Sequence, residues 1–299
     1  MSSVASLRQI RRRIRSVENT RKITRAMEMV AAAKLRRFQD FLESARPYTE
    51  KLQELLDELL RTIPSNDHHP YLRACLQSDR GGPPLPSHAM VVLFTSDTGL
   101  CGTYNSELEK TTREWLRQNS DKKVSFLFVG KQGAHSFQKT QNRPFGTFSD
   151  LRVSRVEEVL QEVRKNLETA FFHSEVDEIY AVYTFAENLS RYEPRVEKIL
   201  PIDRKKVAEE KVSDDLIEPD PKTVLERLLP AFFEARLRFI LYHALLTEQI
   251  ARMTAMRQAT QNAKEMIDEL TLTRNKARQA SITKEIIEIV SGSRALKMK

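Results

Sequence analysis

Glycine, proline and cysteine are scarce in this sequence of 299 residues, which contains 8 glycines, 12 prolines and 2 cysteines. Glycine and proline both disfavour helix interiors, so their scarcity and a charged fraction of 30% favour long, solvated helices over a loop-rich enzyme. The two cysteines, Cys75 and Cys101, are too few for a disulfide framework and have no metal-ligand spacing. A reducing compartment is therefore the simplest expectation.

Long apolar runs are also missing. No stretch approaches the ~20 apolar residues of a membrane-spanning helix, so direct insertion into a membrane is not expected. Near the N-terminus, Val4 and Leu7 stand among polar residues and arginines follow at once, which does not match a secretory signal. The lack of a targeting segment favours a bacterial protein, although a processed organellar chain would look the same.

Positive charge is concentrated near the N-terminus. The formal net charge is +8, and the stretch from Arg8 to Arg37 holds eleven basic residues against two acidic ones, Glu18 and Glu28. Such a stripe suits nucleic acid, an anionic membrane surface or an acidic cavity of another protein. Composition alone does not choose among these partners.

The first sixty residues have the apolar spacing of a helix that packs against a partner. Steps of three and four residues separate most of the apolar side chains, as in the seam of a coiled coil. Pro47 is expected to bend or interrupt this helix, which should stop near Pro64. The expected seam runs through Leu7, Ile10, Ile14, Val17, Ile23, Met27, Val30, Leu35, Phe38, Leu42 and Ala45, and continues with Leu52, Leu55, Leu56 and Leu59.

The middle of the chain differs in composition and in the spacing of its apolar residues. Residues 64–88 are rich in proline and glycine and predict a linker, with one apolar patch at residues 71–76 that predicts a short helix. Beyond the linker, short apolar runs alternate with stretches of helical spacing, which predicts a small Rossmann-like α/β domain with a largely parallel sheet. The expected strands are residues 90–94, 124–129, 179–185 and 195–200, the last two paired, and the expected helices are residues 105–117, 134–139 and 153–172.

From about Pro221 onward the chain again predicts a helix. About seventy residues of helix reach about 100 Å, and a helix of that length needs a partner, for which the N-terminal helix carries a matching stripe. The predicted fold is α/β: a long antiparallel coiled coil of residues 1–63 and 206–299, with the linker and an α/β domain at 89–205 inserted between them. The expected C-terminal seam is Ala259, Ala263, Met266, Leu270, Thr273, Ala277, Ala280, Lys284 and Ile287.

Particular motifs occur in three separate regions. Residues 13–35 read RIRSVENTRKITRAMEMVAAAKL, residues 95–105 read TSDTGLCGTYN, and residues 248–256 and 275–286 read EQIARMTAM and NKARQASITKEI. In this order they resemble the motifs of the gamma subunit family of F-type ATP synthases, and the resemblance covers almost the whole chain. Thr103 departs from the family pattern, where a second glycine is common, and the linker looks longer than usual.

The resemblance implies a non-catalytic subunit without a cofactor, whose two terminal helices form a shaft inside a ring of alpha and beta subunits. It implies that the α/β domain lies near the epsilon subunit and the membrane-embedded c-ring, on the cytoplasmic face of the bacterial plasma (inner) membrane. Rotation of such a shaft, driven by proton or sodium flow, changes the nucleotide affinity of each beta subunit in turn. The complex then makes or hydrolyses ATP, and no nucleic acid takes part.

The resemblance also implies residues that contact partners. Arg278 and Gln279 match the polar residues that engage a loop of the beta subunit, and the alternative is that they are ordinary solvated helix residues. Arg21, Lys22 and Arg25 are expected to contact acidic loops of the beta subunits, against the alternative of a solvated face.

The C-terminal apolar stretch is the last of these expectations. In the family this tip turns in an apolar sleeve of the ring, although ordinary coiled-coil packing would also use such residues. The residues concerned are Ile286, Ile287, Ile289 and Val290.

The remaining candidate sites are weak. Gly99 and Gly102 follow a predicted strand, but the turn is neither a dinucleotide fingerprint nor a Walker loop, so a tight strand-to-helix turn is expected. Cys101 is expected to be a packed residue rather than a nucleophile. His68 and His69 lie in the linker, and a metal role for them is a guess. The α/β domain is therefore expected to be a scaffold with no catalytic, cofactor or metal site.

Two other functions fit parts of the sequence. A nucleic-acid-binding coiled coil would use the basic helix, but its arginines are not interleaved with aromatic residues and the C-terminal helix is rich in carboxylates. A small enzyme with helical arms for dimerisation would need a cluster of acid, base or phosphate-binding groups, which the sequence does not contain. Salt-dependent DNA binding would favour the first function, and self-association without other partners would favour the second.

Overall fold

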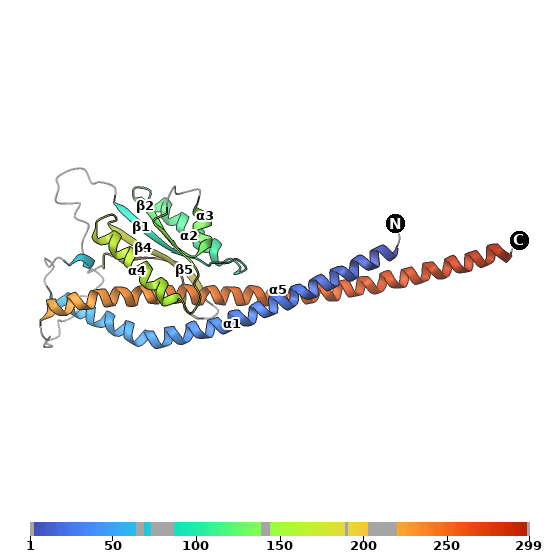
Figure 1. Ribbon diagram of the computed structural model, residues 1–299, viewed down its shortest axis with the longest axis horizontal. Helices are drawn as coiled ribbons and strands as arrows, with labels where there is room; N and C mark the ends of the chain where they lie inside the picture. Colours follow the sequence, from blue (N-terminus) through green and yellow to red (C-terminus); the bar gives the residue numbers. More distant parts are fainter. Residues whose placement is uncertain are drawn as a thin grey trace. The chain divides into compact units, whose positions relative to one another are not determined.

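The computed structural model describes residues 3–63, 69–72, 87–138, 144–188, 191–202 and 220–297. They belong to two compact units: a helical unit of residues 1–31 and 252–299, and a globular unit of residues 32–251. The elements in chain order (Figure 1) are α1 (Ser3–Thr62), the 3-10 helix η1 (Pro70–Leu72), β1 (His88–Phe94), α2 (Tyr104–Gln118), β2 (Lys123–Val129), α3 (Lys131–Phe137), β3 (Gly146–Phe148), α4 (Val156–Phe172), β4 (Glu178–Ala186), β5 (Tyr192–Leu200) and α5 (Pro221–Lys297).

Helix α1 carries a continuous seam of buried and half-buried residues. Three predicted seam residues are wrong, because Ile23, Val30 and Leu55 are 60%, 56% and 39% exposed. Three polar residues, Arg21, Thr24 and Glu28, occupy the seam around the first two instead. The seam steps alternately by three and four through Leu7, Ile10, Ile14, Val17, Arg21, Thr24, Glu28, Ala31, Leu35, Phe38, Leu42, Ala45, Thr49, Leu52, Leu56 and Leu59.

Proline 47 does not interrupt α1, which is one helix from Ser3 to Thr62. The proline is exposed, so the helix carbonyl that loses its usual N–H donor lies on the solvent side, where water can bond it. The predicted interruption is therefore wrong, and the predicted end near Pro64 is close to the observed one.

The globular unit is built on a five-stranded sheet in the order β3-β2-β1-β4-β5. Strands β3, β2, β1 and β4 are parallel, and β5 pairs antiparallel with β4 to form a hairpin. All four predicted strands are present, and so is the predicted pairing of the last two. The sequence did not predict β3, whose three residues are too few to show a period.

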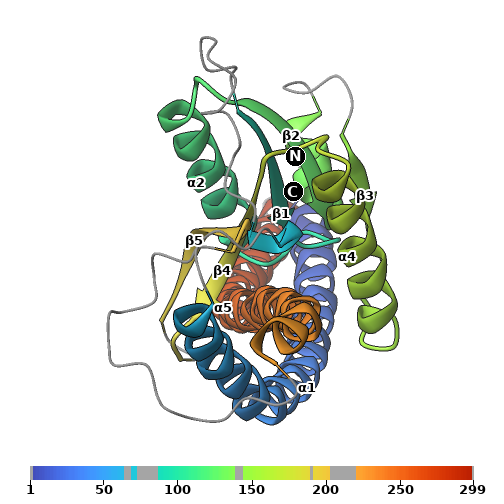
Figure 2. The same cartoon turned by 90° about the vertical axis from the view of Figure 1, so that its left-hand side faces the viewer.

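Helices cover both faces of this sheet. Figure 2 shows α2 on one side of the strands and α4 on the other. On the α2 side, Trp115 packs against Tyr180 of β4 with ring centroids 4.7 Å apart, next to the buried Val91 and Val182. On the other side, α4 presents an apolar stripe made of Val159, Leu160, Val163 and Leu167, all almost fully buried.

Helix α5 is the central helix of the globular unit, and charged side chains join it to α4. The Arg238 guanidinium lies 2.9 Å from Glu157 of α4 and 2.9 Å from Glu234 on its own helix. Arg164 of α4 also pairs with Glu234, and the Tyr242 hydroxyl donates a hydrogen bond to Glu157. The two helices are thus held side by side by alternating charges as well as by apolar packing.

Only a small part of the predicted linker is described. Tyr71 of η1 is buried against Phe172 and Phe233, with ring centroids 5.0 Å and 5.6 Å away, and its hydroxyl donates to Glu168 at 2.7 Å. The rest of the predicted linker, including His68 and Cys75, lies outside the described residues, as does the predicted domain boundary at residues 205–206.

We expect Glu157 to contribute to the acid sensitivity of the globular unit. Burial alone would raise the pKa of its carboxyl, but Arg238 and Tyr242 outweigh burial and hold this pKa below its usual value. Such a carboxyl stabilises the fold above its unfolded pKa of about 4.3, and this stability is lost as the pH falls through the folded pKa. In urea unfolding measured from pH 7 to pH 3, the free energy of unfolding should fall less for Glu157→Gln than for the unchanged chain.

The matched control is Glu162→Gln. Glu162 lies exposed on the same helix and has no ion pair in the described part of the chain. Its replacement should therefore leave the fall in unfolding free energy between pH 7 and pH 3 unchanged. If Glu157→Gln unfolds with the same pH dependence as the unchanged chain, the α4–α5 charge pairs do not contribute to it.

Candidate functional site

The edge of the sheet where the parallel strands end is the place at which a Rossmann-like fold would bind a nucleotide. Here the chain's own loops occupy that edge. Asp97, just after β1, accepts hydrogen bonds from the backbone N–H groups of Lys131 at 3.3 Å and Leu151 at 2.9 Å. Thr95 Oγ1 accepts one from the N–H of Gly133 at 2.9 Å. Groups that could cradle a phosphate are thus used to tie α3 and the loop before α4 to the strand.

The glycine-containing turn after β1 is a packed strand-to-helix connection. Gly102 has a φ of 60°, and Leu100 adopts a similar backbone conformation with a φ of 65°. The Asn105 side chain donates to Ser96 Oγ at 2.8 Å and to Cys101 Sγ at 3.3 Å, and Cys101 is 2% exposed. The turn has the tight geometry that the sequence predicts, and Cys101 is a buried, packed residue.

No group of three or more histidine, cysteine, aspartate or glutamate side chains that could hold a metal ion occurs among the described residues. His69 stacks on the Tyr71 ring, with centroids 5.7 Å apart, and its Nδ1 accepts a hydrogen bond from the Tyr71 N–H at 3.4 Å. His69 therefore has a local packing role, and its neighbour His68 lies outside the described residues.

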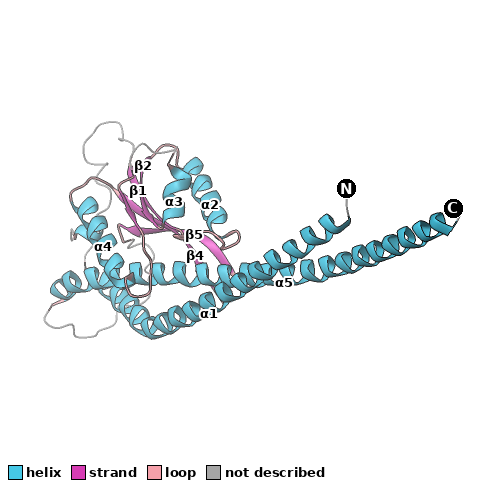
Figure 3. Cartoon of the chain, turned by 45° about the vertical axis from the view of Figure 1, so that its right-hand side comes forward, coloured by secondary structure: helices cyan, strands magenta, loops and turns pink. Residues whose placement is uncertain are grey.

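The second candidate is the surface of the helical unit, where the two terminal parts of the chain run side by side (Figure 3). Their contact is polar at its centre. The Thr260 hydroxyl donates to the Thr24 hydroxyl at 2.8 Å, and Arg257 pairs with Glu28 at 3.1 Å. Sequence reasoning did not identify these pairs, although Thr24 and Glu28 continue the three–four stepping of the apolar seam and could have been included on that ground.

The seam of α5 in the helical unit differs from the expected one. Ala259, Ala263, Leu270 and Ala277 are buried or half-buried as predicted. Met266 is 42% exposed, and Thr273, Ala280, Lys284 and Ile287 are exposed as well. On a helix, the residues three and four positions after a seam residue lie on either side of the seam. The spacing of apolar residues does not decide which of the two is buried. The observed seam is Met256, Ala259, Ala263, Ile267, Leu270, Arg274, Ala277 and Ser281.

The predicted contact residues are mostly on the outside of this unit. Arg278, Gln279, Lys22 and Arg25 are exposed, whereas Arg21 is half-buried in the seam. None of these five side chains has a hydrogen bond or ion pair within the described part of the chain. Four of the five predicted side chains are thus available to another protein.

The predicted apolar tip is also exposed. Every residue from 282 to 293 is exposed, and in Figure 1 this end of α5 extends past the N-terminal end of α1 within the same unit. The exposed fractions are 55% for Ile286, 58% for Ile287, 71% for Ile289 and 49% for Val290. Large apolar side chains gathered on a solvent-facing helix are typical of surfaces that bind other molecules.

None of the helices in the described residues is long and apolar enough to cross a bilayer.

Comparison with known proteins places this geometry in context. A family model described as ATP synthase matches residues 6–296. The ATP synthase gamma chain of Moorella thermoacetica is 39% identical over 294 residues, which cover 98% of this chain and 100% of the relative. That of Halothermothrix orenii is 38% identical over 296 residues, which cover 98% of this chain and 99% of the relative.

Solved structures share the fold. One is the rotor of the Euglena gracilis mitochondrial ATP synthase in rotational state 1, with a TM-score of 0.62 at 18% identity over 93% of this chain and 99% of that one. Another is the OSCP/F1/c-ring assembly of the same organism in rotational state 3, with a TM-score of 0.67 at 19% identity over 98% and 95% of the two chains. Both similarities bear out the combination of a five-stranded α/β sheet with long terminal helices.

We expect Gly130→Ala to destabilise the globular unit by about 2 kcal/mol or more. Gly130 has a φ of 106°, and a Cβ added there would lie 2.1 Å from the Thr95 carbonyl oxygen. Urea unfolding followed by near-ultraviolet circular dichroism measures the change. Gly99→Ala is the control, because nothing lies within 4 Å of a Cβ at that position, and its effect should stay within about 0.5 kcal/mol. Equal effects of the two changes would contradict the close approach of Gly130 to Thr95.

The observed seam of α5 can be tested with two neighbouring residues. Ile267→Ala should lower the protection of the helical unit against hydrogen exchange by about 1 kcal/mol, because Ile267 is half-buried in the seam. Met266→Ala should change it by less than about 0.5 kcal/mol, because Met266 is 42% exposed. The reverse order of the two effects would favour the seam expected from the sequence.

Proposed function

The chain belongs to the family of ATP synthase gamma chains, and from this premise we propose that its helical unit acts as the rotating shaft inside the alpha–beta ring. It is a non-catalytic subunit of the central stalk, and ATP is made or hydrolysed in the beta subunits. The observation that carries the proposal is the match over 98% of the chain to relatives of almost the same length. The paired, exposed helices of residues 3–31 and 252–297 supply an element suited to the task.

Such a shaft couples sites by presenting different contacts in different directions. It must be stiff, and it must not look the same from its three sides. The helical unit meets the second requirement because α5 continues beyond α1, and because the basic N-terminal part of α1 differs from α5 in charge. Differential contact with three otherwise identical subunits is what biases their nucleotide affinities.

Arg278 and Gln279 are proposed to form a polar contact with a loop of the beta subunit. Both side chains are exposed and have no partner in the described part of the chain, so engagement breaks no internal bond. An arginine binds carboxylates through two parallel hydrogen bonds and keeps its charge at any physiological pH. Together these features support a strong contact that can be released at each step of rotation.

The basic face of α1 is proposed as a second contact with acidic loops of the beta subunits. Lys22 and Arg25 are exposed and can reach such loops directly. Arg21 is half-buried in the helical seam, so its part in the contact is smaller. Because these pairs would form near water, they would weaken as ionic strength rises.

The exposed tip at Ile286, Ile287, Ile289 and Val290 is proposed to turn in an apolar sleeve of the ring. Apolar contact has no directional bonds, so it can hold the axis in place while the helix rotates. The globular unit is proposed to contact the epsilon subunit and the c-ring. As a gamma chain, the protein is a peripheral subunit of a membrane-bound complex, and we place it on the cytoplasmic face of a bacterial plasma membrane.

Reconstitution tests the shaft. The purified chain would be mixed with alpha and beta subunits, and complex size and ATP hydrolysis followed together. We expect one copy per three alpha–beta pairs. Replacing both Arg278 and Gln279 by alanine should lower hydrolysis by about ten-fold, because a hydrogen bond to a charged group contributes about 1.5 kcal/mol or more and 1.36 kcal/mol corresponds to a factor of ten.

Lys264→Ala is the matched control. Lys264 is an exposed cation on the same helix and belongs to none of the proposed contacts, so hydrolysis should stay unchanged. If the double variant assembles and hydrolyses ATP at the unchanged rate, the proposed contact of Arg278 and Gln279 with the beta subunit is contradicted, but the shaft function is not. A failure of the unchanged chain to assemble with alpha and beta subunits would overturn the proposal as a whole.

A further inference from the structure

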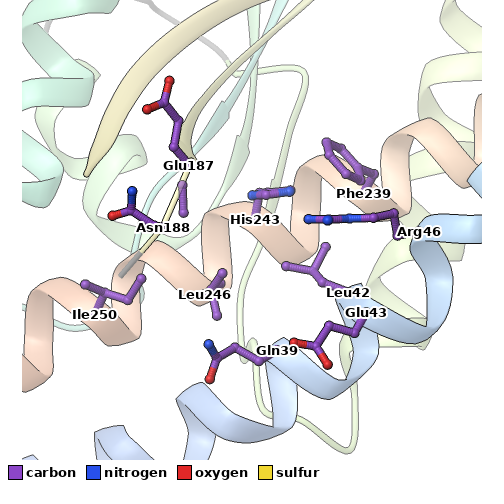
Figure 4. Close-up of a pocket in the computed structure, with 11 residues that line it drawn as sticks. Gln39, Leu42, Glu43, Arg46, Glu187, Asn188, Phe239, His243, Leu246 and Ile250 are labelled. Carbon is purple, nitrogen blue, oxygen red and sulfur yellow. The ribbon is translucent and has the colours of Figure 1, made fainter. Parts of the chain in front are cut away.

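A small pocket within the globular unit has no role in the function proposed above. It lies between α1, α5 and the end of β4, and its volume is about 280 Å³. This is near the lower end of the range for small-molecule sites, about 300–1,000 Å³. Figure 4 shows its lining, with His243, Arg46 and Phe239 at one end and Ile250 at the other.

His243 is the unusual group of this pocket. Its side chain is 5% exposed and packs against two phenylalanine rings, with centroid distances of 4.6 Å to Phe185 and 4.3 Å to Phe239. Its Nδ1 is buried without a hydrogen-bond partner in the described part of the chain. A buried polar atom left unpaired costs about 1–3 kcal/mol, so it marks a place where a bonding group from outside would be stabilised.

The surroundings of His243 are positively charged. Burial and three arginines, Arg46 of α1, Arg236 of α5 and Arg195 of β5, lower the pKa of the imidazole to about 4. Arg195 and Arg236 already pair with carboxylates, the former with Glu193 and the latter with Glu197. Arg46 has no ion pair or hydrogen bond in the described part of the chain, so its charge is free to attract an anion.

Apolar side chains form one line along the pocket, beside the amide side chains of Gln39 and Asn188. Leu246 and Ile250 follow His243 on α5, and Leu42 of α1 faces them. Seven residues of helix separate His243 from Ile250, which is about 10 Å at ~1.5 Å per residue. Two carboxylates also line the pocket: Glu187 lies on the side of Asn188 and Ile250, where it disfavours an anionic group, and Glu43 lies one helical turn from Arg46 on α1.

We propose that this pocket binds a small organic acid with an extended apolar body about 10 Å long, its carboxylate at Arg46 and His243 and its body over Leu42, Leu246 and Ile250. The Arg46 guanidinium would hold the carboxylate through two hydrogen bonds. His243, with its proton on the nitrogen that faces the acid, would donate a third. A bound ligand would touch α1, α5 and β4 at once and so would stabilise the globular unit.

Binding should in turn raise the pKa of His243. The charged groups around its ring are Arg46, Arg195, Arg236, Glu43 and Glu187, and a bound carboxylate adds a negative charge beside them. An opposite charge within a few ångströms favours the protonated imidazole. By linkage, the acid binds more tightly as the pH falls toward the His243 pKa of the complex, provided that the ligand stays ionised.

The experiment uses the full chain and octanoate, an eight-carbon carboxylate. With ¹³C-labelled histidine, one resonance should shift saturably on addition of octanoate, and it should be the one missing from His243→Gln. Isothermal titration would give the dissociation constant. Arg46→Gln should raise that constant by about ten-fold, because it removes charge-assisted hydrogen bonds. Acetate should bind at least ten-fold more weakly, because it lacks the apolar body.

Two controls make the result decisive. Arg37→Gln removes the same charge from an exposed position on the same helix and should leave the affinity unchanged. Octylamine has the same apolar body with a positive head and should bind much more weakly. The proposal is overturned if octanoate gives no saturable shift at His243, if octylamine binds equally well, or if Arg46→Gln and Arg37→Gln have equal effects. A pocket filled only by water would give the first of these results.

Discussion

A helix of 77 residues cannot bury its own apolar face, and this constraint shapes the rest of the molecule. Within the globular unit α5 finds partners all round: every residue from Ile240 to Ala251 is buried, with α1 seam residues such as Phe38 and Leu42 contributing to the same core. The sheet and α4 add apolar and charged contacts along the same helix, among them Thr247, whose hydroxyl donates to the Thr184 carbonyl oxygen of β4 at 3.2 Å. The α/β part of the chain therefore packs around α5, and loops of the chain itself occupy the carboxyl end of β1.

The same two helices pack differently in the helical unit. The seam there contains small and polar residues, with the Thr24–Thr260 hydrogen bond at its centre and the Arg257–Glu28 pair beside it. Arg257 is 68% exposed on its side chain, so its ion pair adds little stability. Polar seam residues fix which positions face each other at a cost in affinity between the helices. In the helical unit, these polar pairs thus fix the register between α1 and α5 but add little to the strength of their contact. This suits an element that works inside an enclosing ring.

The spacing of apolar residues was enough to predict the long helices and the four longer strands, because this spacing recurs several times within each of these elements. It could not assign the seam residue by residue, because apolar character was taken as the mark of burial: Ile23 is exposed and Thr24 is buried. Pro47 was expected to bend or interrupt the helix, but the helix continues through it, because an exposed proline is tolerated in a helix whose core side is held by packing. His243 carried no signal, since three of the groups around it, Arg46, Phe185 and Arg195, come from distant segments.

The tip of α5 shows where packing within this chain ends. Beyond the buried Ser281, every residue up to 293 is exposed, and five of them are isoleucine or valine, at positions 282, 286, 287, 289 and 290. Valine and isoleucine are poorer helix formers than the neighbouring Glu285 and Glu288, so local propensity does not explain their presence on a solvated helix. Burial against a partner would remove apolar area from water at about 25 cal/mol per Å². The solvent-facing position of these side chains therefore makes physical sense only in an assembly, and it argues that the free chain is not the form for which this sequence is adapted.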